Sequence, residues 1–182
     1  IARWGLMRNA LPVNIQEHSH MVAVLEPALG VIRRDIFHQP CDVNALATAA
    51  LYHDASEILT GDLPTPIKYH NAEIMSAYHA VEDLAVQKLL GMLPPELRET
   101  YADVLAEDKD GDIYPLVKAA DKLSAYIKCI EERKAGNNEF LSAEAQTRAA
   151  LDASPLPEVQ YFLEHFIPAF ERDLDELGAI GQ

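Results

Sequence analysis

Residues 113–135 read IYPLVKAADKLSAYIKCIEERKA and predict one long helix. Apolar side chains recur along it at near-helical spacing: Leu116, Val117, Ala120, Leu123, Ala125, Ile127 and Ile130. The turn formers Gly136-Asn137-Asn138 follow directly and end it. Asp121 lies inside this apolar stretch, where a carboxylate is costly unless it is paired or bound to a cation. The stretch therefore predicts a core helix that carries one candidate functional residue.

The remaining chain shows the same helical patterning. We expect further helices over residues 15–36, 43–53, 71–90, 94–105, 139–151 and 158–177. Asp42 is a plausible N-cap, Asn71 opens its helix and Gly91 ends it. Pro27 should kink or end the first helix, and Pro168 should kink the last.

Two stretches between these helices are expected to be non-helical. Residues 60–66 contain two prolines and a glycine and predict an ordered loop, and the acidic residues 107–112 predict an exposed turn. No pair of strands is convincing. The prediction is an all-α fold of about six or seven helices, with residues 1–182 forming a single domain.

The composition narrows the classes of partner. The chain has 182 residues, with 15 Lys and Arg against 29 Asp and Glu, which gives a net charge of −14. Duplex DNA and anionic lipid are bound through accumulated basic residues, so we expect no nucleic acid polymer and no membrane as partner. A small anionic substrate remains compatible, because a bound metal can invert the local field. The two cysteines, Cys41 and Cys129, form no paired motif and fit buried thiols of a cytoplasmic protein.

Imidazole and carboxylate groups in clusters are the ligands that divalent metals require. The candidates are His18, the dipeptide His53-Asp54 and Asp121. Each has a plainer alternative. His18 could be an ordinary hydrogen-bonded histidine at a helix start, His53-Asp54 could close a helix and its turn, and Asp121 could pair with Lys118 or Lys122.

Other catalytic patterns are missing from the sequence. It holds no G-x-S-x-G nucleophile elbow and no glycine-rich phosphate loop. His20 lies about 200° round a helix from His18, so both cannot face one site. No catalytic role is assigned to the remaining histidines: His20, His38, His70, His79 and His165.

The order His18, His53-Asp54, Asp121 on a helical chain resembles the metal-dependent HD superfamily of phosphohydrolases. Five stretches are similar to a narrower group, the bacterial 5′-deoxynucleotidases: residues 3–9, 17–19, 52–57, 60–66 and 135–140. That family removes phosphate from deoxyribonucleoside 5′-monophosphates. The resemblance implies a single-domain helical HD-domain fold.

The resemblance also implies a set of site residues. A divalent cation, with cobalt or manganese favoured and other ions possible, would be held by His18, His53, Asp54 and Asp121. Substrate contacts would come from Arg3, Trp4, Asp54, Asp62, Leu63, Pro64, Thr65 and Asp121. The family further implies a homodimer.

Roles for individual side chains follow from these placements. Glu57 lies three residues after Asp54, within one turn if the helix resumes there, and is expected to orient or deprotonate the attacking water. Arg3 would hold phosphate oxygens through its guanidinium fork. Trp4 would offer an apolar plane beside the sugar, and Asp62 would contact the sugar or assist the leaving oxygen.

Two other classes stay open at this point. One is another HD-type phosphohydrolase, acting on a cyclic nucleotide or an alarmone. The stretch from Asp62 to Thr65 and the pair Arg3-Trp4 argue against it. The other is a non-enzymatic helical interaction module with a structural metal or none.

Overall fold

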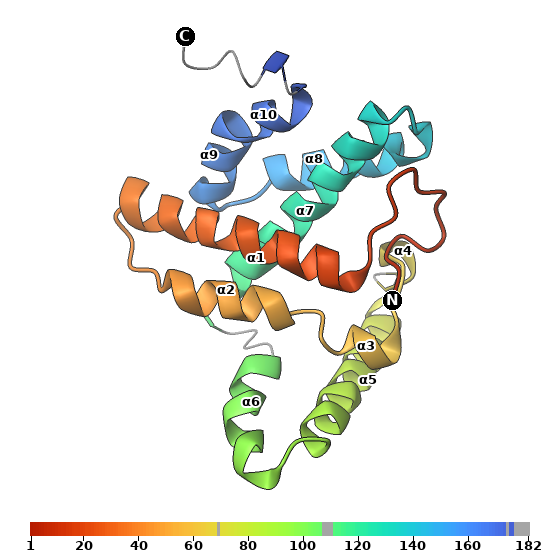
Figure 1. Ribbon diagram of the computed structural model, residues 1–182, viewed down its shortest axis with the longest axis vertical. Helices are drawn as coiled ribbons and strands as arrows, with labels where there is room; N and C mark the ends of the chain where they lie inside the picture. The colour runs from red at the N-terminus through yellow and green to blue at the C-terminus, as the bar shows by residue number, and fades with distance from the viewer. Residues whose placement is uncertain (69, 107–110, 174, 177–182) are drawn as a thin grey trace.

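The computed structural model describes residues 1–68, 70–106, 111–173 and 175–176, with only the backbone of Thr65 and Pro66 (Figure 1). Seven helices in these ranges have eight residues or more: α1 Ile15–Val31, α2 Val43–Tyr52, α5 Ala72–Gly91, α6 Arg98–Leu105, α7 Tyr114–Lys134, α8 Leu141–Asp152 and α9 Pro157–His165. Three are shorter: α3 Glu57–Thr60, α4 Thr65–Lys68 and α10 Ile167–Glu171. The described residues form no strand beyond one isolated bridge between Ala2 and Asn14. The all-α prediction is confirmed.

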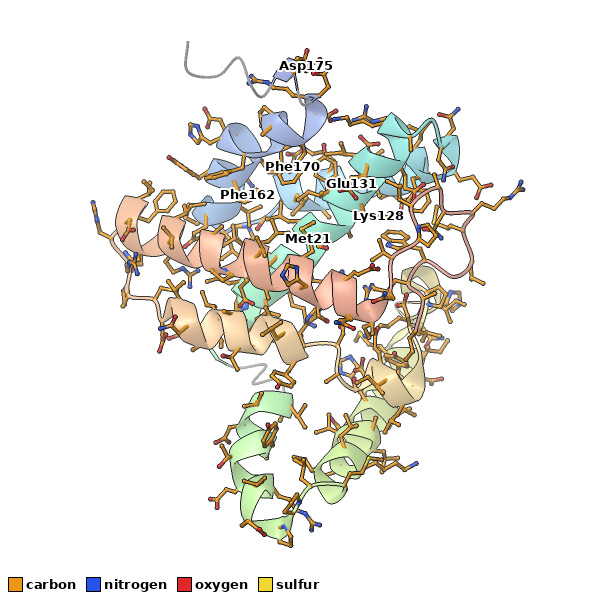
Figure 2. All side chains as sticks on the ribbon, in the orientation of Figure 1. Met21, Lys128, Glu131, Phe162, Phe170 and Asp175 are labelled. Atoms are coloured by element: carbon orange, nitrogen blue, oxygen red, sulfur yellow. The ribbon has the colours of Figure 1, made fainter. Side chains whose placement is uncertain are left out.

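The core is built around α7, the helix that the quoted stretch predicted. Helix α1 crosses α7 and packs along α2 (Figure 1), while α8 and α10 pack against α7, and α9 packs against α1, α8 and α10. Phe162 of α9 and Phe170 of α10 extend the core beyond α1 (Figure 2). Fully or almost fully buried apolar side chains come from α1, α2, α7 and α9, among them Val22, Leu29, Leu46, Leu116, Leu123, Ile127, Ile130 and Phe162.

Polar side chains fix where the main helices begin. The Asn14 side chain accepts hydrogen bonds from the backbone amides of Gln16 and Glu17, at 2.9 and 3.1 Å, and the backbone amide of Asn14 donates in return to the Glu17 carboxylate. This reciprocal pair sets the first turn of α1, and therefore the position of the next residue, His18. Asp42 caps α2 and Asn71 caps α5, as predicted.

Pro27 disturbs the first helix less than expected. Helix α1 continues through Pro27 to Val31 and then through a π-helical turn, Ile32–Ile36, so the expectation of an early end is wrong. Proline removes one backbone hydrogen bond, whereas Leu25 and Leu29 on either side of it are buried in the core. Tertiary packing therefore outweighs the local preference.

Two segments differ from the sequence prediction. The expected loop at 60–66 is only Gly61–Pro64, because Pro66 is the second residue of α4, where a helix does not need its N–H. The last helix breaks at Phe166, before Pro168, and α10 ends at Glu171; residues 175 and 176 are helical again, and the expected end at residue 177 lies outside the described residues. Most of the turn expected at 107–112 lies outside the described residues.

Among the described residues, no helix is both long enough and apolar enough to cross a lipid bilayer.

Candidate metal centre and phosphate site

Three separate elements bring the predicted ligands together. His18 is buried in the first turn of α1, His53 and Asp54 follow the last turn of α2, and Asp121 lies in the second turn of α7. Because α1 packs against both α2 and α7, these positions meet at one end of the three-helix contact. Residues from three distant parts of the sequence therefore meet in one site.

The cluster has the compactness that a single ion requires. One ligand atom each from His18, His53 and Asp121 lie within 4.8 Å of one another. His18 Nε2 is 3.1 Å from Asp121 Oδ1 and 3.3 Å from Asp54 Oδ2. His53 Nε2 is 3.2 Å from the same Asp54 oxygen. All four residues predicted as ligands are thus gathered together.

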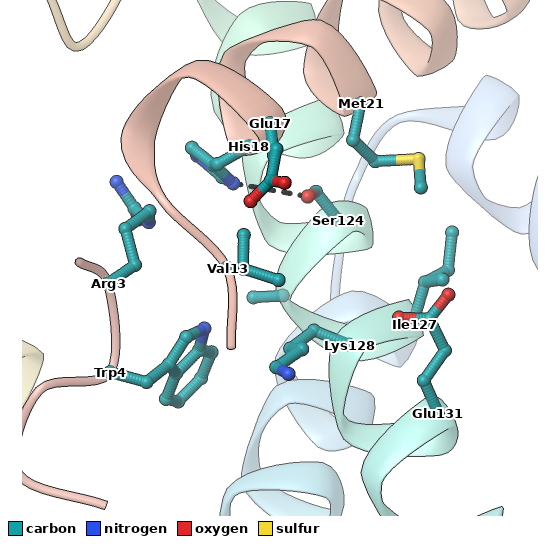
Figure 3. A pocket seen from close by; sticks show the side chains of 11 residues that line it. Arg3, Trp4, Val13, Glu17, His18, Met21, Ser124, Ile127, Lys128 and Glu131 are labelled. Atoms are coloured by element: carbon teal, nitrogen blue, oxygen red, sulfur yellow. Dashed lines mark hydrogen bonds between the residues drawn. The ribbon is translucent and has the colours of Figure 1, made fainter. Parts of the chain in front are cut away.

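The two imidazoles are oriented by their far nitrogens. His53 Nδ1 is 2.7 Å from the carbonyl oxygen of Ala50, which can only accept, so Nδ1 carries the proton and Nε2 presents its lone pair. His18 Nδ1 is 3.2 Å from the hydroxyl of Ser124 (Figure 3). Among the described residues, neither buried Nε2 atom has an aligned hydrogen-bond partner, although carboxylate oxygens are near. Orphaned imidazole nitrogens on rings held in place at their far nitrogens fit metal ligation.

The electrostatics of the cluster favour a positive charge at its centre. Burial alone would raise the pKa of Asp54 and Asp121, but the two histidines outweigh it, lowering Asp54 well below its usual value and Asp121 to about 2. Burial alone would lower the pKa of His18 and His53, but the carboxylates outweigh it and raise both. Two ionised carboxylates beside two imidazoles attract a cation.

Arg3 places a permanent cation at the edge of this cluster. Its guanidinium donates to Asp54, donates to Glu57 Oε2 at 3.2 Å and lies 4.0 Å from Asp121 Oδ1. Burial opposes its charge, but the surrounding carboxylates raise the pKa of Arg3. The five-donor fork is therefore held where an anion bound to the cluster would meet it.

Glu57 begins α3, so the helix does resume after Asp54. Its side chain is only 8% exposed, and burial together with the charge of Asp54 raises the pKa of the carboxyl to about 8. A carboxyl with that pKa gains and loses its proton near neutral pH.

Trp4 and Asp62 lie together beside the cluster. The amide of Trp4 donates to Asp62 Oδ2 at 3.3 Å, and its indole packs against Phe140 with ring centroids 5.3 Å apart. Leu63 and Pro64 follow in the loop and are partly buried, while the side chain of Thr65 lies outside the described residues. The contact made by Asp62 is thus with the Trp4 backbone.

A cavity of about 120 Å³ adjoins these residues (Figure 3). Its walls include Arg3, Trp4, His18, Ser124 and Lys128, so it opens from the cluster along α7. A second cavity of about 320 Å³ lies between α2, α6 and α7 and reaches His53 from the other side.

Sequence reasoning missed Ser124 and the polar stripe to which it belongs. Asp121, Ser124, Lys128 and Glu132 recur every three or four residues along α7. That spacing places them on one helix face. A polar stripe at helical spacing beside the apolar face of this helix was a usable signal for the residues that adjoin the site.

Comparison with known proteins agrees with this geometry. A family model described as 5′-deoxynucleotidase YfbR-like matches residues 1–170. The 5′-deoxynucleotidase YfbR proteins of Shigella boydii and Escherichia coli are each 48% identical over 179 residues, which is 98% of this chain and 90% of the relative.

Solved structures show the same fold. An HD-domain phosphohydrolase from Listeria innocua aligns with a TM-score of 0.83 at 25% identity, over 93% of this chain and 82% of its own. The cyanophage S-2L HD phosphohydrolase DatZ, bound to dA and one catalytic Zn²⁺, aligns with a TM-score of 0.58 at 27% identity, over 97% and 91%. The identity over nearly the whole length, together with the gathered histidines and aspartates, shows that this chain belongs to the YfbR-like family of 5′-deoxynucleotidases within the HD-domain phosphohydrolases.

Proposed function

We propose that this chain hydrolyses deoxyribonucleoside 5′-monophosphates to deoxyribonucleosides and phosphate, with a divalent cation held by His18, His53, Asp54 and Asp121. The observation that carries the proposal is the convergence of two orphaned, buried imidazole nitrogens and two carboxylates beside the guanidinium of Arg3. The relatives that share the chain's length are 5′-deoxynucleotidases, and DatZ is bound to a deoxynucleoside and zinc.

The ligand set leaves the identity of the ion open to several metals. Two imidazole nitrogens and two carboxylate oxygens suit many first-row divalent ions, and we propose cobalt or manganese, with zinc as the ion that DatZ holds. When bound, such an ion lowers the pKa of a coordinated water towards neutrality and neutralises phosphate charge.

Arg3 is the residue that we assign to the phosphate. Its guanidinium stands beside Asp54 and Asp121, so it meets the oxygens of a phosphate that reaches those carboxylates. A planar fork can bind two of those oxygens at once and fix the angle at which the phosphorus faces the attacking water. Trp4 then covers the sugar with an apolar surface.

Glu57 is the residue that we assign to the proton. Its Oε2 atom is 3.2 Å from the guanidinium that holds the phosphate, and its pKa of about 8 lets it accept a proton from the attacking water and hold it. Asp62, fixed by the amide of Trp4, is positioned near the leaving 5′ oxygen. Leu63, Pro64 and Thr65 form the adjacent wall for the sugar in this proposal.

Three further features belong to the proposal: the single domain rests on the helical patterning, the cytoplasmic location on the cysteines, and the homodimer on the family resemblance. We propose that residues 1–182 act as a single domain, that two copies form a homodimer and that the enzyme works in the cytoplasm.

The test is phosphate release from matched deoxy- and ribonucleoside 5′-monophosphates and from cyclic nucleotides, measured after chelation and after adding back Co²⁺, Mn²⁺ or Zn²⁺. The proposal expects release from the deoxy substrates, dependent on the metal. Preferential turnover of a cyclic nucleotide would indicate a different HD phosphohydrolase. Metal binding without turnover of any substrate would indicate an interaction module.

A further inference from the structure

The segment before α1 carries both Arg3 and Trp4 but has almost no regular structure. Its two ends run antiparallel, with the Arg3 amide donating to the Val13 carbonyl at 2.9 Å and the Ile15 amide donating to the Ile1 carbonyl at 3.0 Å. Between them, residues 5–12 loop out towards the end of α7 (Figure 1). The position of Arg3 therefore depends on what holds that loop.

A buried carboxylate on α7 holds the tip of the loop. Glu132 is fully buried, and its two oxygens accept the amides of Ala10 and Leu11 at 2.8 and 2.9 Å. The ammonium of Lys128, one turn earlier on α7, donates to Glu132 and to the Leu11 carbonyl. Burial would raise the pKa of Glu132, but these donors outweigh it and lower the pKa to about 2, so the carboxylate stays charged.

The turn after α7 holds the loop at a second point. Asn137 Nδ2 donates to the Arg8 carbonyl at 2.6 Å and to Glu132 Oε2 at 2.7 Å. The Arg8 amide donates to Glu139 at 3.0 Å, and the Arg8 side chain pairs with the same carboxylate. Asn137 and Glu139 belong to the stretch 135–140, which the proposed chemistry leaves without a role. We call Lys128, Glu132, Asn137 and Glu139 the clasp.

Trp4 shows that the held conformation is one the free chain would avoid. Its φ is +58°, in the left-handed region that residues other than glycine rarely adopt. Its indole rests on Phe140, which is fully buried and follows Glu139 directly. The same turn therefore supports both the loop tip and the Trp4 ring.

We propose that the clasp is a positioning device for the substrate site, holding the N-terminal segment so that Arg3 and Trp4 stand beside the metal cluster. The inference rests on the proposed function, in which these two residues bind phosphate and sugar. The metal candidates lie on α1, α7 and the turn after α2, so loosening the clasp leaves them in place. Loosening it lowers the fraction of molecules in which Arg3 is placed, and the apparent substrate affinity falls by that fraction.

Two neighbouring asparagines give a matched pair of variants. Asn137→Asp keeps the side-chain oxygen that caps the next turn but replaces the donor to Arg8 and Glu132 with a second carboxylate. Asn138 is exposed and makes no side-chain hydrogen bond within the described part of the chain, so Asn138→Asp is the control. Glu132→Gln is a second test, and Glu158→Gln is its control, because Glu158 is also buried and ion-paired, with Arg33 at 2.5 Å.

The effect is measured as the change in KM for a deoxyribonucleoside monophosphate in steady-state kinetics. Asn137→Asp and Glu132→Gln should raise KM about tenfold or more at unchanged metal content, since a hydrogen bond to a charged group is the interaction removed. Combined with both Arg3→Ala and Trp4→Ala, either substitution should add almost nothing, because these are the two residues through which the clasp acts. Additive losses in that combined variant would overturn the proposal.

Trp4 also gives a readout that needs no activity, because it is the only tryptophan in the chain. Asn137→Asp should shift its emission to longer wavelength and increase quenching by acrylamide, whereas Asn138→Asp should do neither. Unchanged emission and unchanged KM in both clasp variants would overturn the proposal. If Asn137→Asp shifts the emission while the wild type itself releases no phosphate, the positioning of Trp4 is upheld and the result counts against the proposed function instead.

Discussion

Ser124 on α7 lies 3.2 Å from the Nδ1 atom of His18 on α1, one turn along from Asp121. One helix thus supplies a candidate ligand and also the group that orients another. The contact turns His18 Nε2 towards the carboxylates of Asp54 and Asp121. The orientation of α7 about its own axis therefore determines both the position of Asp121 and the orientation of the His18 ring.

Replacing Ser124 with Ala should weaken metal binding without removing a ligand. Partners that orient a ligand imidazole are typically worth about 10- to 100-fold in metal affinity. The measurement is competition with a chromophoric chelator for Mn²⁺ or Zn²⁺ at neutral pH. An affinity equal to wild type would mean that packing alone orients His18.

Glu57→Gln should separate metal binding from the rate. The amide keeps the shape of the side chain but cannot accept the proton, and groups that act in proton transfer contribute about 10²- to 10⁴-fold. We expect wild-type metal content with kcat lowered by that range. If the metal is lost instead, with no separate defect in rate, Glu57 is a ligand or a scaffold residue.

Trp4 is proposed to select the sugar. The indole tolerates the C–H of a deoxyribose but leaves an added 2′ hydroxyl without a hydrogen bond, which costs about 1–3 kcal/mol, or roughly 5- to 150-fold. Trp4→Ala should therefore raise kcat/KM for a ribonucleotide relative to its deoxy counterpart at unchanged metal content. Trp4→Phe, which keeps an aromatic surface, is the control. An unchanged ratio in folded Trp4→Ala protein would make Trp4 only an anchor on Phe140.

Glu26 predicts how stability depends on pH. It is fully buried on α1, neither carboxylate oxygen has a partner among the described residues, and burial raises its pKa from 4.5 to about 8. A raised pKa means that the folded state binds the proton more tightly, so this contribution to stability is complete below pH 4.5 and is lost as the pH rises through 8.

Glu26→Gln, which cannot ionise, should thus match wild type at pH 5 and exceed it at pH 8. Each kcal/mol moves Tm by about 2–4 °C in a chain of this size, so a gap of several degrees should open between the two curves. Melting of metal-free protein across that range is the measurement. Parallel Tm curves would show that Glu26 does not titrate between these pH values.

The sequence was most informative where a simple pattern carried the signal: a regular spacing of apolar residues, or a fixed order of histidines and aspartates. The spacing of apolar residues predicted α7, and His18, His53-Asp54 and Asp121 were identified before any contact between them was known. Both signals are local: a helix period and a costly carboxylate on an apolar face. That the four candidate ligands meet in one site was expected from the family resemblance and not from periodicity.

The parts that could not be predicted depend on distant packing. Pro27 does not end α1, because burial on both sides of it outweighs one lost hydrogen bond. Glu132 lies in a charged run at the end of α7, a pattern typical of a solvated face, yet it is fully buried against Ala10 and Leu11. No local rule links residues at that separation.

The most direct test of the central claim, a metal-dependent deoxynucleotidase centred on the gathered histidines and aspartates, is one variant measured in two ways. Metal content per chain and phosphate release from a deoxyribonucleoside monophosphate are compared between wild type and Asp121→Asn. Losing a charged ligand should cost at least the roughly 10- to 100-fold that follows loss of an orienting partner, so both quantities should fall together while the helical circular dichroism is kept. Normal metal content and normal turnover in Asp121→Asn would contradict the account.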